Sequence, residues 1–415
     1  MTDTPKNVKP AIIVMFALFF MIAFVTNFAG SMGVIVTNQF GASKALSQLG
    51  TLANFIAYAC MGIPAGIILK RKGYKYTALA AVMVGFVGVS VQWLSGVAAS
   101  FFVYVIGAFI AGFSMCMLNI VVNPLLNTLG GGGNRGNQLI QMGGSCNSIG
   151  GTIAPILLGW LIGGEASKAT VADASPAMLI AMGIFAVAAV IIAMTDIPEP
   201  HIENTVREKS RYSPLAFRHF TLGAIAIFFY VGIEVGIPNT ANIYFSDMEG
   251  VGPAVTGTMI GAFYFCMLAG RLVGSAVGGK VSSKAMLCTT SILAIGLLIA
   301  FIVLAGMDNM SSINIFGKSI PLPLLPISLC GLCMSVMWGA IFNLSAEGLG
   351  KYTAAASGIF MTLVCGGGII PFVQNLLADS IGSVSSYYLL IGGLLYLAFY
   401  ALWGSKNVNK DIPID

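Results

Sequence analysis

The chain has 415 residues, of which 57% are hydrophobic and only 8% are charged. This composition excludes an ordinary soluble domain, in which roughly a quarter of the residues carry charge. The formal net charge of +5 comes from basic residues in short segments between long apolar stretches, so we expect no nucleic-acid partner.

The apolar stretches have the length of about 20 residues that a membrane-spanning helix needs. They do not alternate polar and apolar residues as the strands of a membrane barrel do. We therefore expect an all-α integral membrane protein embedded in a lipid bilayer. In chain order, the twelve predicted helices cover residues 11–36, 46–69, 76–96, 100–128, 138–163, 177–196, 219–246, 254–278, 284–306, 321–348, 353–378 and 384–403.

The basic residues predict the orientation of the chain, because cytoplasmic loops are enriched in Lys and Arg. If the N-terminus is cytoplasmic, the outer loops hold only three basic residues, Lys44, Lys168 and Lys318. Sixteen others fall on the inner side, and Arg271 is left near a helix end. We therefore predict a multi-pass protein of the inner (cytoplasmic) membrane, with both termini cytoplasmic.

A polar segment of mixed charge divides the helices into two sets of six. It covers residues 197–217, so we predict an N-terminal bundle at 1–196, a cytoplasmic linker at 197–217 and a C-terminal bundle at 218–415. An internal repeat supports this division: NPLLNTLG begins at Asn123 and GGTIAP ends at Pro155, while NLSAEGLG begins at Asn343 and GGGIIP ends at Pro371. Two parallel six-helix repeats are typical of major facilitator transporters.

Several short motifs, in this order and spacing, carry a more specific resemblance. They are IPAGIILKRKGYK, NPLLNTLG, CNSIGGTIAP, FFYVGIEVGI, GRLVG and the run from IFNLSAEGLG to GGGIIP. With them the chain resembles the major facilitator superfamily and, within it, the fucose–galactose–glucose:proton symporter family. The resemblance implies two pseudo-symmetric six-helix bundles and a neutral sugar as substrate. It also implies acids in the first and fourth helices, but the first helix has none and Asn119 stands at the expected position in the fourth.

The most conspicuous residue is Glu234, a single carboxylate inside the seventh apolar stretch. A charge at the bilayer centre costs about 2.5–3.5 kcal/mol on insertion scales, so such residues usually mark a pathway or an ion site. We predict that Glu234 binds the coupling cation; the alternative is a structural acid that bonds a neighbouring helix.

The residues that follow Glu234 bear on the nature of the cation. Pro238 has no N–H, so the carbonyl of Glu234 loses its helical partner. Together with Asn239 and Asn242, these oxygens favour Na⁺, for which we predict a site at Glu234 and Asn242. H⁺ remains open, because burial of the carboxylate would suffice for it. Asn239 is also a candidate ligand of the substrate.

Amides on the fourth and fifth helices are the candidate sugar ligands of the first half, because an amide both donates and accepts hydrogen bonds. Asn119 and Asn123 are four residues apart on one helix face, and Gln141 and Asn147 lie on the next helix. The alternative is that these amides join helices to one another.

In the second half, Trp338 lies near the middle of the tenth helix, where its ring can stack on a sugar or simply fill the core. Asn343 follows it and is predicted to face the same cavity. Arg271 is predicted to pair with a carbonyl or with Glu347 and not to bind solute.

The sequence has no arrangement of residues that suggests an enzyme, and we predict no cofactor. We expect a secondary transporter that imports a hexose or related small saccharide together with Na⁺ or H⁺. The alternatives are a sugar uniporter, an exporter of another polar solute, and a membrane sugar sensor that does not transport.

Overall fold

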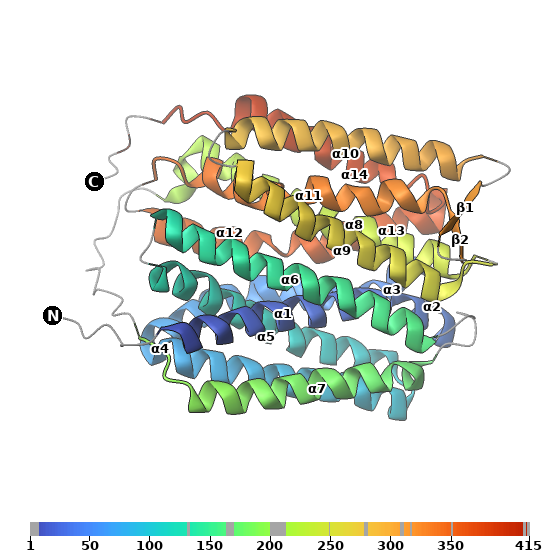
Figure 1. The fold of residues 1–415 in the computed structure, drawn as a ribbon, viewed down its shortest axis with the longest axis horizontal. Helices are drawn as coiled ribbons and strands as arrows, with labels where there is room; N and C mark the ends of the chain where they lie inside the picture. Colours follow the sequence, from blue (N-terminus) through green and yellow to red (C-terminus); the bar gives the residue numbers. More distant parts are fainter. Residues whose placement is uncertain are drawn as a thin grey trace.

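A computed structural model of the chain describes residues 8–130, 133–162, 170–199, 213–248, 250–277, 281–307, 311–315, 318–349, 352–409 and 412. Within these ranges, twelve helices are long and apolar enough to cross a membrane. This confirms the predicted all-α fold with twelve spans. Figure 1 shows the helices lying side by side along the long axis of the molecule, with α1–α7 in one layer and α8–α14 in the other.

The first half contains α1 (Lys9–Ser31), α2 (Gly33–Gln39), α3 (Lys44–Ser47), α4 (Leu49–Ala98), α5 (Phe101–Leu129), α6 (Gly133–Ile162) and α7 (Val171–Met194). The helix α4 contains two spans joined at Gly73. The second half contains η2 (Pro214–Ala216), α8 (Arg218–Ser246), α9 (Gly252–Val277), α10 (Ser283–Ala305), β1 (Ser312–Ile315), β2 (Lys318–Pro321), α11 (Leu324–Ala346), α12 (Thr353–Leu363), α13 (Gly366–Ile381), α14 (Tyr387–Phe399) and η4 (Tyr400–Gly404).

Because the number of spans is even, the first span begins and the last span ends on the same side of the bundle. We call this the terminal side. The opposite side, which carries α2, α3 and the β1–β2 hairpin, is the far side (Figure 1). Each of the two sides receives the ends of all twelve spans, so the side on which a residue lies follows from its position along its helix.

The structure differs from the predicted helices mainly at their ends. The first span is interrupted at Met32, between α1 and α2, and the eleventh is divided between α12 and α13. The sixth begins at Val171 and not at 177, because the Thr170 and Asp173 side chains form a capping box. The tenth begins at Leu324 and not at 321, because Pro321 pairs with Ser312 in an antiparallel hairpin that the sequence did not suggest.

The turn between the second and third spans is fastened to the end of α7. Gly73 has a φ of +85°, a conformation that glycine adopts without strain. The Glu199 carboxylate accepts hydrogen bonds from the backbone N–H groups of Tyr74 at 2.6 Å and Lys75 at 2.9 Å. A Cβ at position 73 would collide with this carboxylate. The turn therefore requires glycine for two separate reasons.

The backbones of the two halves approach closely where α6 crosses α9. A Cβ on Gly159 would lie 3.2 Å from the Cα of Gly257, and a Cβ on Gly257 would collide with the carbonyl oxygen of Pro155. Small residues allow membrane helices to pack at such short distances. Gly159 lies near the end of α6 and Gly257 near the start of α9, so this crossing belongs to the far side.

Candidate functional site

A cavity of about 630 Å³ lies between the two halves. This volume is within the range of about 300–1,000 Å³ that small-molecule sites have. Helices α1, α4, α5 and α6 form the wall on the first half, and α8–α12 form most of the wall on the second half. The lining includes Gly274, Ser283 and Met286, which lie near the terminal-side ends of α9 and α10. The cavity therefore extends toward the terminal side.

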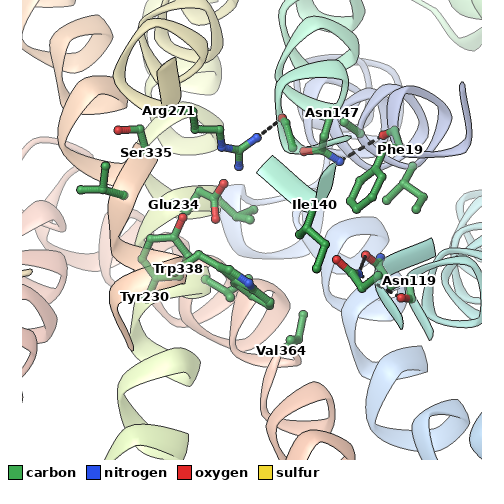
Figure 2. Close-up of a pocket in the computed structure, with 18 of the residues that line it drawn as sticks. Phe19, Asn119, Ile140, Asn147, Tyr230, Glu234, Arg271, Ser335, Trp338 and Val364 are labelled. Atoms are coloured by element: carbon green, nitrogen blue, oxygen red, sulfur yellow. Dashed lines mark hydrogen bonds between the residues drawn. The ribbon is translucent and has the colours of Figure 1, made fainter. Parts of the chain in front are cut away.

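Glu234 lies on the second wall of the cavity, on α8. Its polar neighbours are Tyr230, one helical turn before it, and Arg271 on α9. Figure 2 shows the carboxylate between the Arg271 guanidinium and the rings of Tyr230 and Trp338. The Tyr230 hydroxyl donates a hydrogen bond to the carbonyl oxygen of Met334, 3.0 Å away. An ionisable group is thus held between helices on the wall of the cavity.

Arg271 connects the two halves across the cavity. Its Nη1 donates to the hydroxyl of Ser148 at 2.7 Å and to the carbonyl oxygen of Gly144, both on α6. The same guanidinium faces Glu234 in its own half. One positive charge therefore has partners on both sides of the interface. This arrangement lets the charge on Glu234 influence a contact between the halves.

Aromatic rings surround the carboxylate on the second wall. Trp338 makes edge-to-face contacts with Tyr230, at 6.2 Å between ring centroids, and with Phe360, at 5.8 Å. The indole is only partly buried, because part of it faces the cavity. A ring that is fixed at two edges and open on one side is a suitable surface for the C–H groups of a sugar.

Amides provide most of the polar side chains of the first wall. Asn119 donates a hydrogen bond to the Tyr58 hydroxyl at 3.1 Å and another to the carbonyl oxygen of Met115 at 3.0 Å. Asn123 donates to the backbone oxygen of Asn119 at 2.9 Å. Asn147 donates to the carbonyl oxygen of Phe19 at 3.1 Å, as Figure 2 shows. In each of these side chains the donor nitrogen is engaged, and its position is thereby fixed.

The structure brings most of the predicted site residues together. One cavity is lined by Glu234, Asn119, Asn123, Asn147, Trp338 and Asn343. Asn343 is exposed and lies in the last turn of α11, at the terminal side. The side chain of Gln141 lies outside the described residues, although its neighbours Ile140 and Gly144 line the cavity.

Asn239 and Asn242 do not share the cavity with Glu234. Asn239 donates to the side-chain oxygen of Gln48 at 3.2 Å, and Asn242 donates to the carbonyl oxygen of Ser31 at 3.3 Å. Eight residues of helix separate Asn242 from Glu234, a rise of about 12 Å. In this conformation the two side chains cannot hold one cation between them, so the predicted pairing of Glu234 with Asn242 is not formed.

The sequence did not point to several residues of the cavity. Arg271 was expected to pair with a carbonyl, as it does, but it also faces the cavity and the acid. Tyr58, Tyr230 and Tyr264 look like core aromatics in the sequence. Asn27 is an amide in an apolar span, a signal that was available and unused.

On the far side the cavity is closed by contacts between the halves. The Asp379 carboxylate of α13 accepts hydrogen bonds from the backbone N–H groups of Lys44 and Ala45, both at 2.9 Å. The Lys44 ammonium donates to the Ser383 hydroxyl at 2.8 Å. Asn38 donates to Asp247 at 3.3 Å. These bonds join the α2–α3 segment of the first half to the ends of α8 and α13.

Comparison with known proteins agrees with this architecture. A model of the Major Facilitator Superfamily matches residues 14–372. A glucose/galactose transporter of Brucella abortus is 32% identical over 417 aligned residues, which cover 98% of this chain and 97% of that protein. The L-fucose-proton symporter of Escherichia coli K12 is 23% identical over 94% of this chain and 92% of its own length.

Solved structures have the same fold. The crystal structure of the E. coli fucose:proton symporter matches with a TM-score of 0.68 and 19% identity, covering 97% of this chain and all of that one. The inward-open xylose transporter XylE from E. coli matches with a TM-score of 0.73 and 10% identity over 98% of both chains. Twelve spans in two halves around a central cavity define a membrane transporter. The chain belongs to the Major Facilitator Superfamily.

Proposed function

We propose that the protein imports a neutral sugar, a hexose or related small saccharide, across the inner membrane by symport with a cation. The observation that carries this proposal is the composition of the cavity, which combines fixed amides on one wall with a tryptophan and a single acid on the other. The printed names of the relatives, a glucose/galactose transporter and an L-fucose-proton symporter, support the substrate class.

The chemistry of the walls suits a neutral polyol. A hydroxyl group both donates and accepts a hydrogen bond, and so does an amide. Asn147 is already fixed through its donor nitrogen, so its oxygen remains as an acceptor for a sugar hydroxyl. The Asn119 oxygen accepts a long bond of 3.5 Å from the Asn123 amide, and its second lone pair remains for a sugar hydroxyl. The two charged residues of the described lining, Glu234 and Arg271, have opposite signs. The cavity therefore has no excess charge that would favour a charged solute.

We infer that the terminal side is cytoplasmic, because the basic residues of the sequence gather there. The described conformation, with its far side closed and its cavity extending to the terminal side, then corresponds to an inward-facing state. Transport requires that the halves rock so that the same cavity faces the other side. Labelling of a single cysteine tests the orientation: Ser312→Cys should react from outside intact cells, and Lys406→Cys should not.

Glu234 is the proposed site of the coupling cation, and its surroundings favour H⁺ over Na⁺. The Arg271 guanidinium beside it repels a second bound cation, and Asn242, the amide expected to complete a Na⁺ site, is remote. A proton also needs no further ligands. When a proton neutralises Glu234, Arg271 is free to bind Gly144 and Ser148; when the proton leaves, the carboxylate attracts the guanidinium.

One transport assay tests the whole proposal. Purified protein in liposomes is given D-glucose, D-galactose or L-fucose under a proton gradient alone, a Na⁺ gradient alone, or neither. Accumulation driven only by the proton gradient is the expected result. Equilibration without accumulation under either gradient would make the protein a uniporter. Binding of sugar without any flux would make it a sensor, and retention of all three sugars outside with no binding would exclude sugars as the substrate class.

A further inference from the structure

A second polar site lies beyond the closed end of the cavity, on the far side. It consists of four amides, which we call the far-side amide cluster: Gln48 at the N-cap of α4, Asn239 of α8, and Gln374 and Asn375 of α13. Gln48, Gln374 and Asn375 are fully buried, and Asn239 is 6% exposed. None of the four lines the central cavity.

The cluster is organised around one turn of α8. Gly236, Asn239 and Thr240 are three and four residues apart and share one face of the helix. The side-chain oxygen of Gln374 lies against Gly236, so that a Cβ there would be 2.6 Å from it. Asn239 bonds Gln48 at 3.2 Å, and Thr240 accepts from Asn375 at 2.9 Å. The four amides therefore form one continuous layer.

The hydrogen-bonding capacity of this layer exceeds what the closed conformation uses. Four of its polar atoms find no partner in the described part of the chain: Gln48 Nε2, Gln374 Oε1, Gln374 Nε2 and Asn375 Oδ1. Exchange of the oxygen and nitrogen of Gln374 changes nothing, because both are unpaired. Buried polar groups are paired in most proteins, so an unpaired group calls for an explanation.

The interface between the halves supplies this explanation. Gln48 belongs to the first half, and the other three amides belong to the second. If the halves rock as the proposed function requires, Gln48 would separate from Asn239, and both faces of the layer would line the opening. Amides that are unpaired in the closed state would then meet solutes arriving from the far side before these reach the central cavity.

We propose that the far-side amide cluster is a second saccharide subsite, formed when the far side is open. This inference rests on the proposed transport of a neutral sugar and adds a place where the sugar binds first. The ligand class follows from the chemistry of the cluster, because four amides and no charged group match hydroxyls that donate and accept. Closure of the far side returns the amides to their unpaired state and so releases the sugar inward.

The test compares transport from the two sides. Gln374→Met keeps the length of the side chain and removes its polar atoms. Uptake of D-glucose, D-galactose and L-fucose by intact cells measures access from the far side, and uptake by inside-out vesicles measures access from the terminal side. We expect the KM for uptake by intact cells to rise about three- to tenfold, because one or two hydrogen bonds to the sugar are lost. The KM for uptake by inside-out vesicles should not change.

Two further variants keep the test decisive. Gln48→Met removes an amide from the opposite face of the layer and should reproduce the one-sided effect, even if Gln374→Met fails to fold. Gln92→Met is the matched control, since Gln92 is a buried amide of α4 that packs on α5 at Gly107. It should change neither KM.

Three results would overturn the inference. An unchanged KM on both sides, with a raised Tm, would mean that the amides serve only the packing of the closed state. An equal rise on both sides would mean that the substitutions act through the central cavity. If the parent protein takes up none of the three sugars from either side, the proposed function itself fails, and the subsite fails with it.

Discussion

The two walls of the central cavity differ in chemistry although the two halves repeat one fold. Among the lining side chains that the structure describes, the first wall carries amides and no charge, whereas the second carries Glu234 and Arg271. Charge on a carboxylate can change during transport, and an amide cannot change in this way. The difference suggests a division of work in which the first wall recognises hydroxyls and the second wall responds to the cation.

This division departs from what the family resemblance implies. The resemblance places acids in the first and fourth helices, both in the first half, but Asn119 stands at one of these positions. The carboxylate of this chain lies across the cavity, close to the arginine that reaches back to α6. Under the proposed function, coupling to the motion of the halves would use one acidic and one basic residue of the same half.

The largest expected effect comes from removing the negative charge of the second wall. Glu234→Gln keeps the shape of the side chain and its ability to form hydrogen bonds. We expect the variant to lose concentrative uptake entirely while it retains exchange of sugar down its gradient, because a neutral side chain cannot take up a proton. Accumulation in liposomes under an imposed proton gradient measures this.

Glu347→Gln is the matched control, because Glu347 is an exposed acid at the end of α11. It should accumulate sugar like the parent. Accumulation by Glu234→Gln equal to that of the parent would assign coupling to another residue and leave Glu234 with a structural role.

A second test separates the two charges. Arg271→Gln leaves the Glu234 carboxylate without its compensating charge and removes the link to α6, and we expect uptake to fall by about 100-fold, equivalent to about 3 kcal/mol. The double variant Glu234→Gln/Arg271→Gln carries neither charge and should recover exchange, though not accumulation. If the double variant is as impaired as Arg271→Gln alone, the two charges do not act on each other.

The first wall should respond differently. Asn147→Ala leaves sugar hydroxyls and the Phe19 carbonyl without a partner, so we expect the Kd for sugar to rise about 5- to 150-fold, from a loss of about 1–3 kcal/mol. The number of protons moved per sugar should stay the same. Asn54→Ala serves as control, because Asn54 is a buried amide of the first half that bonds Ala108 outside the cavity. A changed number of protons per sugar in Asn147→Ala would mean that the first wall also takes part in coupling.

The smallest expected effect concerns the support of Asn119. Tyr58→Phe removes the hydroxyl that accepts from this amide, whose bond to Met115 remains. We expect the Kd for sugar to rise about two- to tenfold, with no effect on coupling. Titration of sugar binding to purified protein is the measurement. An affinity equal to that of the parent would show that the Tyr58 hydroxyl is not needed to position Asn119 for the sugar.

The sequence predicted the spans, their number and the central acid because each depends on hydropathy alone. A charged or amide residue in an apolar span indicates something other than lipid beside it. The same signal does not distinguish a cavity from a contact between helices, which is why Asn239 and Asn242 were grouped with Glu234 but pack elsewhere. Tyr58 and Tyr230 gave no signal, because a tyrosine in a cavity wall has the same sequence pattern as one in the core.

The crossing of Gly159 and Gly257 has a practical consequence for capturing the opposite conformation. The closed far side leaves no space for a methyl group at position 257. The added methyl group of Gly257→Ala would therefore destabilise the conformation with a closed far side. A conformation in which α6 and α9 separate at this crossing would accommodate the methyl group. Such a variant should favour the conformation with an open far side, for crystallisation and for the selection of inhibitors that bind from that side.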